Sequence, residues 1–408
     1  MAIPPELERL EADRPPERFT RHQVLFWVFL VVFVAVGIRL HWQGSVIAAG
    51  AVLWGLVTHI FGVVLAALLG WVAAFPIAGP IIVKLLTWPL FLLINGAGWA
   101  VGRGQPPPDA EARGLVGQGN VGNFEKIYAG KGVGFRDDII GRYLRLTREG
   151  IRRAGDRAPD LVVWPETAFP DVIVPDRLYG GGTGILQNFV RSENVALATG
   201  AVGRDAASGK PTNAMFFFGR DGALPEAPYR KVHLLVFGEY VPLSDRFPVV
   251  MKWFPWLADF ARGPGPEVRT LGGVRYGPQI CYEGLFPEFS RGLADRGAQI
   301  FVNVTNDSWF GAPAEPFQHL WMTLARGIEF RRPIVRATNT GISAAMRADG
   351  TSLGDSPIGE EWHGLFSIPY LRSPAPTFYQ RVGYGLVPAV LWLFLAAVLA
   401  AVRLGKRG

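Results

Sequence analysis

The chain has 408 residues, of which 49% are hydrophobic and only 18% charged, and its mean hydropathy is positive. This composition excludes an ordinary soluble enzyme along the whole length and indicates that part of the chain lies in lipid. The single cysteine, Cys281, excludes an internal disulfide and a cysteine-based zinc site. The formal charge of +7 comes from basic residues scattered among acids, so we expect no nucleic-acid binding.

The N-terminal quarter is predicted to enter the membrane. Residues 1–22 are polar and arginine-rich, and 23–102 form a transmembrane domain of about three helices, with apolar runs at 24–42, 45–75 and 80–101. No small-residue cleavage site follows the first run, so it reads as an anchor and not as a removed signal peptide. Buried core helices are the alternative, but three successive runs without amphipathic periodicity favour spans.

The rest of the chain changes character after a proline-rich linker at 103–113. Residues 114–380 repeat the order helix then strand, which predicts a layered α/β domain. A last apolar run, 381–403, predicts one more span. Both arginine-rich ends should stay in the cytoplasm, so three spans before the domain place it on the opposite, periplasmic face. If 45–75 were two spans, the domain would be cytoplasmic.

Three segments carry candidate chemistry. Cys281 follows a strand-like "YGPQI" and precedes a turn into a helix, which suits an exposed nucleophile, although its position alone favours an inert buried thiol. Glu166 in "DLVVWPETAFP" follows a buried strand among apolar residues, a setting that suits a general base. Taken without the other motifs, this position favours a solvated loop carboxylate. In "YRKVHLLVFGEYVP", Lys231 and Glu239 lie eight residues apart. Lys231 is suited to stabilise an oxyanion, and a lysine at the protein surface is the alternative.

Together, "WPETAFP", "RKVHLLVFGEYVP", "ICYEGLFPEFSR", "NVTNDSWFG" and "QHLWMTLARGIEFRRPIVRATNTGIS" resemble the nitrilase superfamily, and more narrowly its membrane-bound branch, the bacterial apolipoprotein N-acyltransferases. The likeness covers roughly residues 114–390. It implies an αββα sandwich flanked by transmembrane helices. It also implies a Glu–Lys–Cys triad in which Glu166 is the base, Lys231 the oxyanion-stabilising lysine and Cys281 the nucleophile.

Further roles come from the same resemblance. Glu239, Tyr282 and Glu283 match residues that support the triad. Apart from the resemblance, four aromatic residues are expected to contact substrate or to form a lid: Trp164, Trp253, Phe254 and Trp256. The last three lie within four residues, between the lysine and cysteine motifs, in a chain with predicted membrane spans. A packed surface loop is the alternative for the last three. The chain departs from the family in having Val236 where proline is usual, and in having fewer N-terminal helices.

The resemblance implies a monomeric enzyme of the bacterial inner membrane. It would move an acyl chain from a phospholipid, through a cysteine thioester, to the N-terminal diacylglyceryl-cysteine of a lipoprotein. No cofactor is implied, and the six histidines lack metal-ligand spacing, so we expect no metal. A membrane-anchored amidase or hydrolase with another acceptor is an open alternative, and an inactive membrane scaffold or a transporter is a weaker one.

Overall fold

The computed structural model describes residues 105–130, 134–175, 181–242, 244, 247–253, 259–309 and 314–383, with single positions 385, 389, 392, 393 and 396. The predicted membrane segment 23–102, most of the predicted span 381–403, and the lid residues Phe254 and Trp256 lie outside this part. Within it, no helix has the length and apolar character needed to cross a bilayer.

The first sheet has six strands in the order β12-β1-β2-β3-β4-β5. Its strands are β1 (Ala110–Gln118), β2 (Leu161–Val163), β3 (Leu197–Arg204), β4 (Pro211–Phe218), β5 (Tyr229–Arg230) and β12 (Trp362–Tyr370). The β1–β2 and β2–β3 pairs are parallel and the rest antiparallel. β1 begins at Ala110, so it includes the last residues of the predicted linker, 103–113. β4 and β5 pair antiparallel, and an Asp-Gly turn lies in the segment that connects them.

The second sheet also has six strands, in the order β11-β10-β9-β8-β7-β6. They are β6 (Arg269–Leu271), β7 (Val274–Ile280), β8 (Ile300–Thr305), β9 (Ile334–Thr338), β10 (Ala344–Met346) and β11 (Ser352–Asp355). The central strands β7, β8 and β9 are parallel. β8 is buried on both faces, as its unbroken apolar and small-polar sequence requires.

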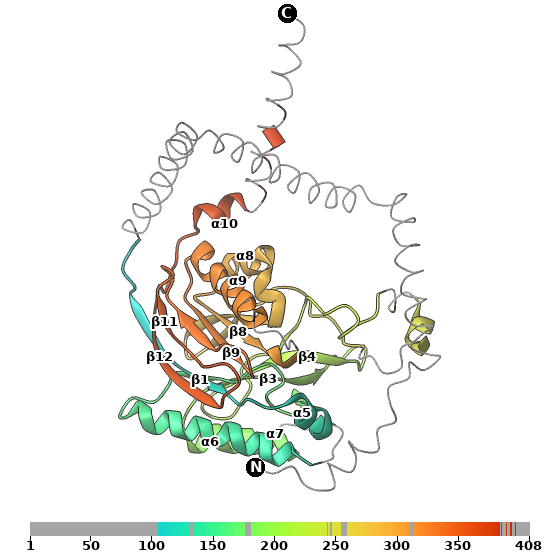
Figure 1. Ribbon diagram of the computed structural model, residues 1–408. Coiled ribbons are helices and arrows are strands. Elements are labelled where there is room, and N and C mark those ends of the chain that lie inside the picture. The colour runs from blue at the N-terminus through green and yellow to red at the C-terminus, as the bar shows by residue number, and fades with distance from the viewer. Residues whose placement is uncertain are drawn as a thin grey trace, which may run out of the picture. The chain divides into compact units, whose positions relative to one another are not determined.

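Helices cover the outer face of each sheet (Figure 1). α6 (Arg136–Ala154) and α7 (Gly181–Ser192) lie on one side, and α8 (Pro287–Asp295) and α9 (Glu315–Phe330) on the other. The short helices are α5 (Asn123–Gly130), α10 (Phe378–Val382) and the 3-10 turns η2 (Pro248–Trp253), η3 (Cys281–Leu285) and η4 (Asp307–Trp309). The predicted αββα sandwich is therefore confirmed.

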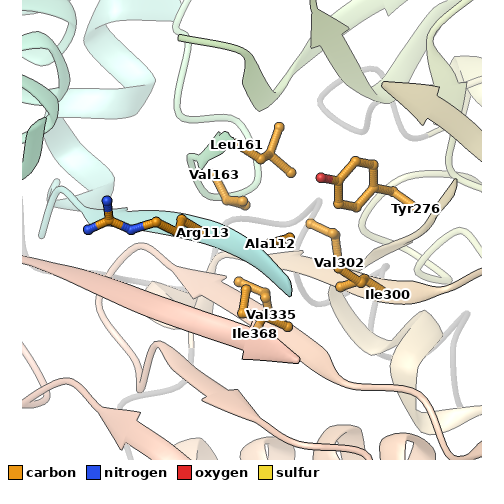
Figure 2. Close-up of a pocket in the computed structure, with 10 residues that line it drawn as sticks. Ala112, Arg113, Leu161, Val163, Tyr276, Ile300, Val302, Val335 and Ile368 are labelled. Atoms are coloured by element: carbon orange, nitrogen blue, oxygen red, sulfur yellow. The ribbon is translucent and has the colours of Figure 1, made fainter. Parts of the chain in front are cut away.

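The inner faces of the two sheets form one apolar core. A small cavity remains between them (Figure 2), lined by side chains of both sheets such as Leu161, Val163, Ile300 and Val302. It contains none of the predicted catalytic residues and belongs to the packing of the sandwich. The chemistry has to be sought where the strands end.

Candidate active site

Polar side chains from both sheets meet beyond the ends of their strands. Glu166 follows β2, Lys231 follows β5, Cys281 follows β7 directly, and Asn306 follows β8. Parallel strands deliver their carboxyl ends to the same edge of a sheet, and functional groups gather there for that reason. The fold thus brings together residues that are more than 100 positions apart, such as Glu166 and Asn306.

The Glu166 carboxylate is held by three donors. Oε1 accepts from Asn213 Nδ2 at 2.7 Å and from Lys231 Nζ at 3.2 Å, and Oε2 accepts from the Asn306 backbone N–H at 3.0 Å. β3 supports this loop closely, because a Cβ atom at Gly200 would lie 2.6 Å from Glu166 Cα. Only glycine permits that approach.

Lys231 is almost fully buried, with 2% of its side chain exposed, between two carboxylates. Its Nζ lies 3.2 Å from Glu166 and 3.0 Å from Glu239. Burial alone would lower the pKa of Lys231, but the negative charges of Glu166 and Glu239 outweigh it and hold that pKa above its usual value. Lys231 is therefore a fixed cation, placed 5.4 Å from the centre of the Tyr282 ring.

Cys281 opens the turn η3 in a left-handed conformation, with φ of 56°. That conformation is unfavourable for a residue with a Cβ atom and is typical of functional positions. Its half-buried thiol is hydrogen-bonded to Thr305. Burial and the negative charge of Glu166 raise the pKa of Cys281 to about 12, although Lys231 opposes them. The thiol is thus protonated at neutral pH and needs a base to react.

Glu283 ties the cysteine turn to the lysine loop and is fully buried. Oε2 accepts from the Ile280 N–H and the Tyr229 hydroxyl, both at 2.8 Å. Oε1 accepts from the backbone N–H groups of Val232 at 2.6 Å and His233 at 3.1 Å. Burial raises the pKa of Glu283 to about 7, against the lowering effect of these donors.

The predicted aromatic residues fare differently. Trp164 is completely buried in the core, where it stacks on Tyr143 and donates its Nε1–H to Thr147 at 2.9 Å. Its surroundings are those of a packing residue, and the expectation that it contacts substrate finds no support in its position. Trp253 ends η2, and its side chain, like Phe254 and Trp256, lies outside the described residues.

Sequence reasoning assigned no role to several residues that touch this site. Asn213 bonds two of the carboxylates, and Lys126 donates to the Glu166 carbonyl and to Thr167 Oγ1, both at 3.4 Å. Burial lowers the pKa of Lys126 to about 8, with Glu166 opposing. Neither residue lies in a motif that the sequence analysis singled out.

A buried polar network lies beneath the cysteine turn. Asn303 Nδ2 donates to the Cys281 carbonyl at 3.0 Å, and Arg336 links Asn303, at 2.8 Å, to Asp307, at 3.0 Å. Asp307, Glu315 and His319 present metal-ligand atoms within 4.8 Å of one another. However, the two oxygens of Asp307 already face Arg336 and His319. A cation beside Arg336 would be repelled, so we interpret these residues as a hydrogen-bonded support.

Comparison with known proteins agrees with this arrangement. Residues 139–363 match the carbon-nitrogen hydrolase family model. The chain belongs to the carbon-nitrogen hydrolase family. Among relatives in that family, the apolipoprotein N-acyltransferase of Bdellovibrio bacteriovorus is 43% identical over 321 residues, covering 76% of this chain and 57% of the relative. That of Geobacter metallireducens is 34% identical, covering 67% of this chain and 51% of the relative.

The resemblance predicted from the motifs is thus confirmed, and the chain spans about half the length of the curated carbon-nitrogen hydrolase relatives it matches. A solved carbon-nitrogen hydrolase from Helicobacter pylori G27 aligns with a TM-score of 0.47 and 17% identity, covering 64% of this chain and 89% of that one.

Proposed function

We propose that this carbon-nitrogen hydrolase is a phospholipid-dependent N-acyltransferase acting on the N-terminal diacylglyceryl-cysteine of lipoproteins. The observation that carries the proposal is the pairing of a protonated, half-buried Cys281 with a buried Glu166–Lys231–Glu239 cluster. The relatives named apolipoprotein N-acyltransferase support this choice of reaction.

In the first half-reaction, Glu166 takes the thiol proton of Cys281 as the sulfur attacks the ester carbonyl of the phospholipid. Lys231 and a backbone N–H near Cys281 stabilise the tetrahedral oxyanion. The carbon–oxygen bond then breaks, and Glu166 returns the proton to the leaving glycerol oxygen. The products are a thioester on Cys281 and a lysophospholipid.

In the second half-reaction, the neutral α-amine of the lipoprotein attacks the thioester. Glu166 accepts a proton from the attacking nitrogen and gives it to the departing sulfur of Cys281. The products are an amide and the regenerated thiol. Glu239 keeps Lys231 in place through both steps, and Glu283 fixes the turn that presents Cys281.

The substrates suggest where the chain acts. We propose that 23–102 and 381–403 are membrane-spanning, that the catalytic domain faces the periplasm with both termini in the cytoplasm, and that the enzyme is a monomer. Lipid substrates leave a bilayer only at high free-energy cost, so a membrane-anchored catalytic domain meets them where they are.

Intact mass spectrometry of the full chain in detergent, after incubation with phosphatidylethanolamine vesicles, tests the proposal. We expect a fatty-acyl adduct on the wild type and none on Cys281→Ala. Adding a peptide with an N-terminal diacylglyceryl-cysteine should then discharge the adduct and acylate the peptide. Lysophospholipid release without an adduct would instead indicate a hydrolase. Turnover by Cys281→Ala would show that Cys281 is not the nucleophile.

A further inference from the structure

Two carboxylates share one lysine in this site. Glu166 and Glu239 both contact Lys231 Nζ, and the three side chains are nearly buried. Two negative charges and one positive charge leave a net charge of −1 in a region of low dielectric constant. Like charges in such a place repel each other, and a donor that reaches both carboxylates reduces this repulsion.

Asn213 on β4 supplies that donor to both carboxylates. Its Nδ2 lies 2.7 Å from Glu166 Oε1 and 2.6 Å from Glu239 Oε1. The amide nitrogen carries two hydrogens, so each carboxylate can receive one. The reverse amide orientation would set an oxygen against two negative oxygens, so the chemistry of the neighbours fixes the orientation.

Two further contacts show that this side chain is placed to donate. Its Oδ1 is buried and has no hydrogen-bond partner among the described residues, so the amide is not oriented by its own acceptor. The Asn213 backbone carbonyl also accepts the Lys231 N–H at 2.8 Å. One residue thus contacts all three charged members of the cluster.

We propose that Asn213 is a positioning residue that keeps Glu166 and Glu239 as two separate carboxylates, each with its own donor, so that Glu166 alone accepts the proton of Cys281. The inference rests on the proposed roles of Glu166 and Cys281. It assigns a task to a residue that touches neither the sulfur nor the acyl group in the proposed mechanism.

The pH dependence of Cys281 reactivity reports on this task without any lipid. Titratable groups that act on the cluster are Lys126, Lys231, Glu239, Cys281, Tyr282 and Asp307. Because Cys281 is the only cysteine, carboxamidomethylation by iodoacetamide adds one mass increment to the full chain. Its rate should rise with pH as the thiol proton is more readily removed.

Asn213→Asp is the informative variant, because it keeps the shape and replaces the donor with a third acidic group. We expect the acid limb of the rate profile to move upward by about one pH unit, which is roughly a tenfold slower reaction at the foot of the limb, with convergence at high pH. Asn213→Ser can serve only one carboxylate and should move the limb less, in the same direction.

The matched control is Gln187→Glu, which makes the same amide-to-acid change at a buried residue of α7 that bonds the Gly222 carbonyl. It should follow the wild-type profile. Superimposable profiles for the wild type and for folded Asn213→Asp would overturn the proposal. If Asn213→Asp does not fold, a wild-type profile for Asn213→Ser overturns it. A chain that used no phospholipid would still give these profiles, so the two proposals fail separately.

Discussion

Replacing Glu283 by glutamine tests how the cysteine turn is held. The change keeps the size of the side chain but turns one acceptor oxygen into an NH₂ group. In the wild type, both oxygens face two donors each: the Ile280 N–H and the Tyr229 hydroxyl on one, the Val232 and His233 N–H groups on the other. Whichever way the glutamine amide turns, two donors lose their acceptor.

The expected loss follows from that count. A buried donor left without an acceptor costs about 1–3 kcal/mol, and the two remaining bonds lose the strength that an ionised acceptor gives. If the NH₂ group faces Tyr229 and the Tyr229 hydroxyl rotates to accept from it, the Ile280 N–H still has no acceptor. Removing a buried ionised carboxylate, whose pKa burial has raised, offsets part of this cost. The two unmatched donors outweigh that relief, so we expect Glu283→Gln to lower the free energy of unfolding by about 3 kcal/mol.

Thermal unfolding in detergent, followed by tryptophan fluorescence, measures this at pH 8. Burial raises the pKa of Glu283 to about 7, so the carboxylate is ionised at that pH. For a domain of this size, about 3 kcal/mol lowers the apparent Tm by roughly 6–12 °C. The control is Glu288→Gln, an exposed residue of α8, which should leave the Tm unchanged. A shift below about 3 °C for Glu283→Gln would refute the reasoning, because it would mean that the donors find other partners.

Two other variants test separate features. Gly200→Ala puts a Cβ atom 2.6 Å from Glu166 Cα, so we expect the loop that carries Glu166 to shift and the rate of Cys281 alkylation at neutral pH to fall by roughly tenfold. The control is Gly184→Ala on α7, where nothing lies within 4 Å of the added Cβ atom, and it should leave this rate unchanged. Burial and the neighbouring Asp307 raise the pKa of Glu315 to about 7, above its usual value near 4.5, so its stabilising protonated form is present below pH 4.5 and lost as pH rises through 7. Glu315→Gln should therefore unfold at a higher temperature than the wild type at pH 8 and at the same temperature near pH 4.5; no difference at pH 8 would contradict this.

The residues that could be predicted are those that lie where an apolar strand ends. Glu166 follows β2, whose apolar run is visible in the sequence, and Cys281 follows the strand-like "YGPQI" that ends β7. Lys231 stood out in a motif of its own, and Glu283 through the resemblance to the family. The layered α/β fold was visible for the same reason, because helical and strand patterns alternate along the chain.

What could not be predicted depends on contacts between distant strands. Asn213 is one amide in a strand that carries no motif, and its partners Glu166 and Glu239 are 47 and 26 positions away. Trp164 adjoins the strand that carries the base, but its side chain points into the core toward Thr147. Strand alternation decides such matters, and a shift of one residue reverses the face.

The arrangement of charges explains why a neutral thiol suits this site. A thiolate formed in advance beside Glu166 and Glu239 would add a third negative charge to a buried cluster that has Lys231 in direct contact with both carboxylates. In the mechanism that we propose, proton transfer from Cys281 to Glu166 instead moves a negative charge across the cluster and leaves the total unchanged. Lys231 then faces a charge that passes from carboxylate to sulfur and on to the oxyanion, without leaving its place. The high pKa of Cys281 and the buried Lys231 therefore both fit the proposed mechanism, in which the sulfur loses its proton only as it attacks.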